Sequence, residues 1–164
     1  MSNTGYSKAQ IAIHWLIAIL VIIQLVLHEG IGNLATHLKD GVEPNTAVLL
    51  LGRSHVVLGL VIFGLAIFRV FVRLKQGAPL PPETENPILV VIAKLTKLIL
   101  YSVLILMPIS GSAAWFLGQE AALKGHLVGK FLLVGFLVLH ILGALYQHFI
   151  LKTDVLKRMV QPEQ

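Results

Sequence analysis

Four long apolar stretches constrain this chain more than any other feature of its sequence. A helix needs about 20 mostly apolar residues to cross the hydrocarbon core of a bilayer. Stretches of that kind lie within residues 9–34, 52–75, 88–117 and 124–152. They predict an all-α fold, in which four transmembrane helices form a bundle. The whole chain, residues 1–164, is expected to be one integral membrane domain.

Composition supports a chain that faces lipid and excludes several kinds of site. Charged residues make up 13% of the sequence, against about 25% in a typical soluble domain. The chain has no cysteine, which excludes disulfides, iron–sulfur clusters and covalent c-type haem. The net charge of +5 does not indicate nucleic-acid binding, because the basic residues lie at helix ends rather than on a soluble face. Membrane lipid is therefore an expected partner, and nucleic acid is not.

The basic residues also predict how the bundle is oriented. Cytoplasmic loops of membrane proteins carry an excess of lysine and arginine. The segments 28–54 and 118–126, which we expect to be a polar loop and a short turn, lie on one side with four basic residues. Both termini lie on the other side, and we therefore expect both to be cytoplasmic. That side holds nine basic residues: Lys8, Arg69, Arg73, Lys75, Lys94, Lys97, Lys152, Lys157 and Arg158.

Histidines inside the apolar stretches are the candidate functional residues. Polar groups are costly inside a bilayer, so each one needs a reason to be there. His14 lies early in the first stretch, His55 near the start of the second, and His140 and His148 in the fourth. Any one of them could be an interfacial residue whose polar tip reaches the headgroups. As a set, they offer imidazoles from three different helices.

The spacing of the histidines predicts two separate sites. His140 and His148 are about 80° apart around a helix and about 12 Å apart along it, so they cannot share one metal. Depth in the membrane favours pairing His14 with His148 and His55 with His140. His126, at the outer end of the fourth helix, is an alternative partner for His55, and spacing alone leaves that choice open. Two axial imidazoles from two helices are what a six-coordinate haem iron needs.

Glycines beside these histidines have two readings. Gly52 and Gly59 flank His55, and Gly135 and Gly143 flank His140. Small residues would let a haem approach the helix backbone. They are also common where transmembrane helices pack closely. The sequence leaves both readings open.

The order and spacing of several motifs resemble the bacterial cytochrome b561 family over nearly the whole chain. Ile13-His14-Trp15 opens the first helix, and Arg53-Ser54-His55 through Gly59 opens the second. Leu139-His140 through Gln147-His148-Phe149 closes the fourth. The resemblance implies a four-helix bundle with two b-type haems. It assigns the axial iron ligands to His14, His55, His140 and His148.

The resemblance also implies a function in the respiratory chain of a bacterial inner membrane. Members of the family move electrons through their haems between a donor and a quinone or a partner redox protein. One branch resembles a superoxide oxidase that reduces ubiquinone, so the chain could be an oxidoreductase. The alternative is a membrane-anchor cytochrome subunit that conducts electrons for a partner dehydrogenase. The short segment 118–125 offers little external surface for a substrate, which counts against the superoxide reading.

Basic residues near the predicted ligands are candidate partners of the haem propionates. Propionates are anions, and arginine or lysine would bind them through charge-assisted hydrogen bonds. Arg69 is the candidate on the inner side, although anchoring at the membrane interface would also explain it. On the outer side the candidates are Arg53, His126 and Lys130. Basic residues are expected mainly on the cytoplasmic side, so their presence on the outer side favours a functional role for them.

Overall fold

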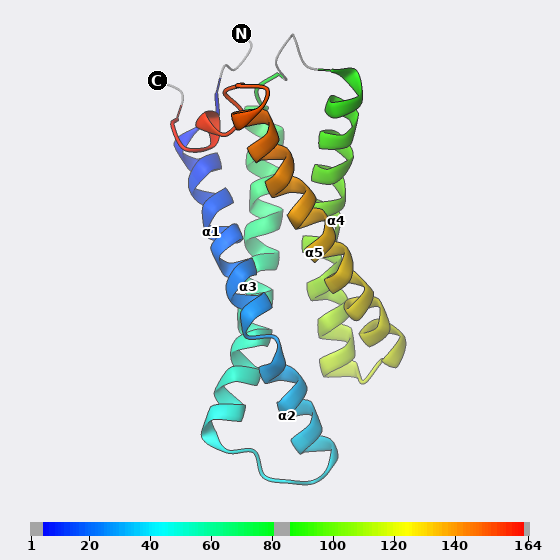
Figure 1. Cartoon of the computed structure of the whole chain (residues 1–164). Helices are drawn as coiled ribbons and strands as arrows, with labels where there is room; N and C mark the ends of the chain where they lie inside the picture. Colours follow the sequence, from blue (N-terminus) through cyan, green and yellow to red (C-terminus); the bar gives the residue numbers. More distant parts are fainter. Residues whose placement is uncertain (1–4, 81–85, 163–164) are drawn as a thin grey trace.

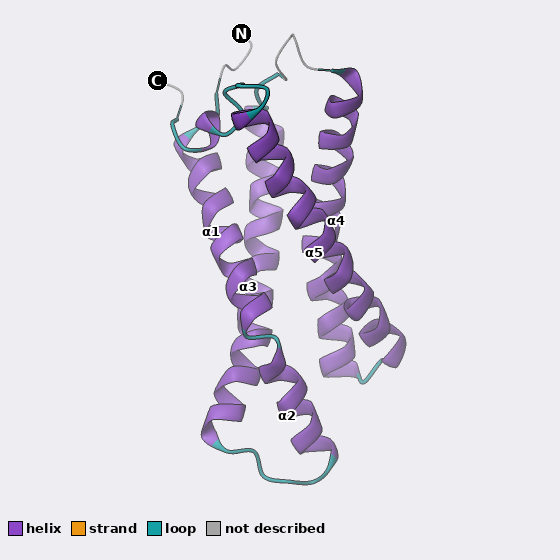
Figure 2. Cartoon of the chain, viewed as in Figure 1, coloured by secondary structure: helices purple, strands orange, loops and turns teal. Residues whose placement is uncertain are grey.

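Helices make up nearly all of the regular structure of this protein. The computed structural model describes residues 5–80 and 86–162, and no strand occurs within them (Figure 2). The helices are α1 (Lys8–Val26), α2 (Glu29–Lys39), α3 (Thr46–Gln76), α4 (Pro87–Leu117) and α5 (Glu120–Phe149), followed by a short 3-10 turn, Lys157–Met159. The predicted all-α class is confirmed.

Four of the helices are long and apolar enough to cross a membrane, namely α1, α3, α4 and α5. Figure 1 shows them as a bundle with both chain ends at one end of it, which we call the terminal end. Helix α2 lies at the other end, which we call the α2 end. The predicted four-span bundle is thus confirmed, and α2 adds a short helix outside the spans.

The first loop differs from the prediction. The expected first helix, residues 9–34, is divided, because α1 ends at Val26 and α2 begins at Glu29. The segment 28–54 is not a simple polar loop, since it contains α2 and the start of α3. Asn45 caps α3 by accepting a hydrogen bond from the backbone of Val48. Helix α3 therefore begins at Thr46, six residues before the predicted position 52.

Close packing of small residues holds α2 against α3. A Cβ atom added at Gly52 would overlap the Leu34 side chain, and one added at Gly30 would lie 2.6 Å from Leu51 Cβ. Leu34 is only 2% exposed. In Figure 1 this α2–α3 unit extends beyond the connection between α4 and α5.

Hydrogen bonds from side chains of α1 and the C-terminal segment to backbone carbonyls close the terminal end of the bundle. Gln10 donates from Nε2 to the carbonyl of Gly77 at 2.9 Å, which ties the start of α1 to the end of α3. Trp15 Nε1 donates to the carbonyl of Met159 at 2.8 Å. Arg158 donates to the carbonyl of Leu80 at 3.1 Å. The C-terminal segment therefore packs across the ends of α1 and α3.

The core is a narrow apolar column inside the bundle. Its buried residues recur every four positions along α1, as a helix with one inward face requires. Much of the remaining apolar surface is exposed, as expected of helices that face lipid. The core residues are Ile13, Ile17, Val21, Ile62, Val72, Val103 and Leu133.

Candidate functional site

Two histidines from different helices meet in the terminal half of the bundle. His14 lies six residues after the start of α1, about 9 Å along the helix axis. His140 lies nine residues before the end of α5, about 13 Å along its axis. Their ring centroids are 6.1 Å apart, with an angle of 70° between the ring planes.

A second histidine pair lies in the half of the bundle nearer α2. His55 lies nine residues inside α3, and His126 lies six residues inside α5. Their ring centroids are 6.3 Å apart, with an interplanar angle of 66°. The two pairs therefore have nearly the same geometry, and α5 contributes one histidine to each.

The histidines lie in other pairs than depth favoured. The structure places His14 beside His140, and His55 beside His126, the alternative partner that spacing had left open. His148 is the penultimate residue of α5, and its ring packs on Phe149 at 4.8 Å. His148 lies at the very end of its helix, whereas His14 lies well inside α1.

His126 is held in place by α4. Its Nδ1 lies 2.8 Å from the carbonyl oxygen of Met107. An imidazole that donates through Nδ1 presents Nε2 as a free lone pair, which is the usual arrangement of a metal-binding histidine. Gly111 lets the ring approach, since a Cβ there would lie 2.9 Å from His126 Nδ1.

His55 has a polar neighbour on α1. Gln24 donates from Nε2 to the backbone carbonyl of His55 at 2.9 Å. Gln24 Oε1 and His55 Nδ1 are both buried and have no hydrogen-bond partner within the described residues. Buried polar atoms of this kind are rare in native proteins and call for an explanation.

Each pair has the dimensions of a bis-imidazole haem site. A metal–imidazole bond is about 2 Å long and the ring nitrogen lies about 1 Å from the ring centroid, so trans imidazoles have centroids about 6 Å apart. Among the described residues, no group of three or more histidine, aspartate or glutamate side chains could hold a bare metal ion. A porphyrin supplies four nitrogens itself, so two histidines suffice for haem iron.

The structure decides between the two explanations of the glycines at Gly52 only. Gly52 serves helix packing, because Leu34 fills the space beside it. Gly59 lies close to the Gln24 side chain, whose Nε2 would be 3.4 Å from an added Cβ. Gly135 and Gly143 are exposed and have no described atom within 4 Å of an added Cβ, so both explanations stay open for them.

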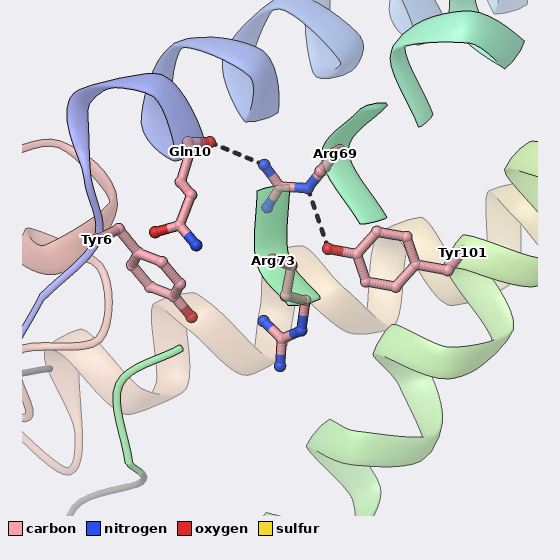
Figure 3. A pocket seen from close by; sticks show the side chains of 5 residues that line it. All are labelled: Tyr6, Gln10, Arg69, Arg73 and Tyr101. Carbon is pink, nitrogen blue, oxygen red and sulfur yellow. Dashed lines mark hydrogen bonds between the residues drawn. The ribbon is translucent and has the colours of Figure 1, made fainter. Parts of the chain in front are cut away.

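Arg69 is the most firmly placed of the basic candidates. It donates from Nη1 to the carbonyl of Gln10 at 2.8 Å and from Nε to the hydroxyl of Tyr101 at 3.1 Å, as Figure 3 shows. On the other half of the bundle, Arg53 is exposed. Lys130 is half-buried, with Nζ 5.9 Å from the centroid of the Phe131 ring.

The spacing of the histidines along α5 already indicated that His126 could belong to a second pair. His126 and His140 are 14 residues apart, which places them about 40° apart around α5 and about 21 Å apart along it. One face of one helix can therefore supply both sites. Gln10 and Tyr101 had no such signal, because their role depends on contacts between distant parts of the chain.

Known proteins resemble this chain along nearly all of its length. The family model described as prokaryotic cytochrome b561 matches residues 5–162. A cytochrome b562 of Cereibacter sphaeroides is 32% identical over 158 residues, which covers 96% of this chain and 96% of that protein. A protein named "Probable superoxide oxidase CybB", from Yersinia pestis, is 27% identical over 176 residues, which covers 94% of this chain and 95% of that protein.

Proposed function

The chain belongs to the prokaryotic cytochrome b561 family, and on that premise we propose that it holds two b-type haems. Membership makes it a b-type membrane cytochrome that transfers electrons. We propose His14 and His140 as the axial ligands of one haem and His55 and His126 as those of the other. The observation that carries this proposal is the matching pair of ring separations, 6.1 and 6.3 Å. His148 leaves the ligand set.

The protein residues would orient the ligands and leave no open site on the iron. His126 donates through Nδ1 to Met107, so its Nε2 is the ligand atom. Gln24 already bonds the His55 backbone, and its Oε1 and the Nδ1 of His55 are both buried without a partner. We propose that Oε1 accepts a hydrogen bond from His55 Nδ1 in the haem-loaded protein, which would fix His55 in the same tautomer. When bound, a bis-histidine haem supplies a reversible one-electron couple rather than oxygen binding.

We propose that the propionates of the two haems are bound by basic residues at both ends of the bundle. Arg69 would serve the haem of His14 and His140, because Gln10 and Tyr101 hold its guanidinium in place. Arg53 and Lys130 would serve the other haem. They lie two residues before His55 and four residues after His126 along their helices.

Electrons would cross the membrane between the two sites. The ligands His126 and His140 are separated by about 21 Å along α5, so the sites lie at different depths. We propose that the terminal end is cytoplasmic, in a bacterial inner membrane, because nine of the thirteen basic residues lie there.

For the reaction, we propose that the protein passes electrons from a donor to the quinone pool. The relative whose printed name is a superoxide oxidase supports superoxide as the donor. Two superoxide anions would give up two electrons and become two molecules of dioxygen. One quinone would take up those two electrons and two protons and become a quinol.

The second candidate is a membrane subunit that conducts electrons for a partner dehydrogenase. The tight turn between α4 and α5 favours it, because only Gly118 and Gln119 separate the two helices. So short a connection leaves little surface near His126 for a substrate site of its own. A partner protein would then supply that site.

Two measurements on the purified protein test these proposals. The absorption spectrum of the reduced protein should contain a b-type α-band, and its absence would refute haem binding. The protein is then mixed with superoxide and a soluble quinone. Rapid quinone-dependent loss of superoxide without any other protein would support the first candidate. No turnover from a fully haem-loaded protein would support the conduit.

A further inference from the structure

A basic hollow opens at the terminal end of the bundle, between α1, α3 and α4. Figure 3 shows five side chains that converge on it from different segments. The hollow is shallow and partly open, with a cavity volume of about 10 Å³. Tyr6 precedes α1, and the other lining residues belong to the three helices: Gln10, Arg69, Arg73 and Tyr101.

The lining is strongly cationic. Arg69 and Arg73 are one turn apart on α3, so both guanidinium groups face the same space, and no carboxylate of residues 5–80 or 86–162 lines it. Two like charges at this spacing repel each other. An anion between them would remove that repulsion.

The hydrogen-bond donors around the hollow are partly fixed and partly free. Arg69 has five N–H groups, and its bonds to Gln10 and Tyr101 use two of them. Tyr101 accepts from Arg69, so its own hydroxyl proton remains available. Gln10 is engaged with Ser7 and Gly77, which holds the wall of the hollow in place. The wall formed by Gln10, Arg69 and Tyr101 is therefore fixed before any ligand binds.

The position of the hollow along the bundle axis indicates the source of an anionic ligand. Arg73 lies three residues before the end of α3, and Tyr6 lies outside α1 altogether. The hollow therefore lies near the ends of the spanning helices, the level at which lipid headgroups are expected. Basic pockets between transmembrane helices at this depth bind the head groups of anionic lipids.

We propose that this hollow binds the phosphate of an anionic phospholipid from the leaflet at the terminal end. Arg73 is the main ligand of the phosphate oxygens; the N–H groups of Arg69 that a haem propionate leaves unused and the phenols of Tyr6 and Tyr101 also donate to them. A neutral quinone headgroup would leave the positive charge of Arg73 uncompensated. The lipid would join α1, α3 and α4 at the end of the bundle where their loops meet.

Native mass spectrometry on the full chain tests the site. The protein is titrated with phosphatidylglycerol and, separately, with zwitterionic phosphatidylcholine. We expect phosphatidylglycerol to bind more tightly, and R73Q to weaken that binding about fivefold, as expected for one basic residue near the surface. K75Q is the matched control, because Lys75 lies on the same turn of α3 and does not line the hollow. It should bind phosphatidylglycerol as the unaltered protein does.

Three outcomes would overturn the proposal. One is equal affinity for the two lipids. Another is an equal loss in R73Q and K75Q, which would indicate a diffuse surface effect. The third is unchanged lipid binding in R73Q together with a lower redox potential of one haem, which would mean that a propionate occupies the hollow. Displacement of phosphatidylglycerol by inorganic phosphate would show that the hollow recognises the phosphate group, and it would support the proposed binding mode.

Discussion

Replacing Gly111 by alanine should selectively disturb the haem site nearer α2. The added Cβ would lie 2.9 Å from His126 Nδ1 and 3.0 Å from Cε1, whereas ordinary contact begins at 3.4 Å. The ring would have to move by about 0.5 Å, which would stretch its 2.8 Å hydrogen bond to Met107 beyond the usual limit of about 3.2 Å. Loss of such a supporting bond typically weakens metal binding about 10- to 100-fold.

The assay is haem transfer from the membrane protein to an excess of haem-free soluble globin. In Gly111→Ala, half of the haem should leave about 10- to 100-fold faster than in the unaltered protein, and the haem of His14 and His140 should leave at the original rate. Gly64→Ala is the control. It also removes a helix glycine, but no described atom lies within 4 Å of its added Cβ.

Gly111→Ala and Gly64→Ala each gain about 0.5–1 kcal/mol of helix stability from the loss of glycine. A difference in haem release between the two variants would therefore not come from helix stability. Equal release rates in Gly111→Ala, Gly64→Ala and the unaltered protein would refute the proposed role of Met107 and Gly111 in holding His126. Faster release of both haems in Gly111→Ala would indicate a global rather than a local effect.

Three further substitutions test separate contacts. Gly52→Ala would force the Leu34 side chain away and should cost about 1–3 kcal/mol of stability, seen as a lower midpoint in thermal unfolding with unchanged haem content. Arg69→Gln removes a positive charge near His14 and should lower the midpoint potential of that haem in a redox titration, without loss of haem. Gln24→Leu removes the proposed acceptor for His55 Nδ1 and should weaken one haem about 10- to 100-fold in the haem-transfer assay; an unchanged release rate would remove Gln24 from the site.

The sequence predicted the transmembrane spans well because their signal is local. Length and hydropathy alone decide whether a stretch can cross a bilayer, and all four expected stretches contain a long apolar helix. Helix α2 was missed because residues 29–39 are only moderately apolar. The segment is helical in the structure because Leu34 and Gly30 pack on α3, a tertiary contact that no local pattern reveals.

The candidate site was predictable in its residue type but not in its pairing. The cost of polar groups in lipid singled out the histidines, and His14, His55 and His140 all belong to the observed pairs. Pairing depends on how the helices are shifted along the bundle axis, which no local pattern reveals. Helix α3 begins at Thr46 and extends beyond the connection between α4 and α5 (Figure 1). His55, nine residues inside α3, therefore lies beside His126, six residues inside α5.

The proposed ligand set is tested most directly by the haem-to-protein ratio of two single variants. His126 and His148 both lie on α5 close to one of its ends, so His126→Ala and His148→Ala are comparable changes. Pyridine haemochrome analysis should find two haems per chain in the unaltered protein and in His148→Ala, and one haem in His126→Ala. Two haems in His126→Ala and one in His148→Ala would contradict the pairing and restore the ligand set that the sequence alone suggested.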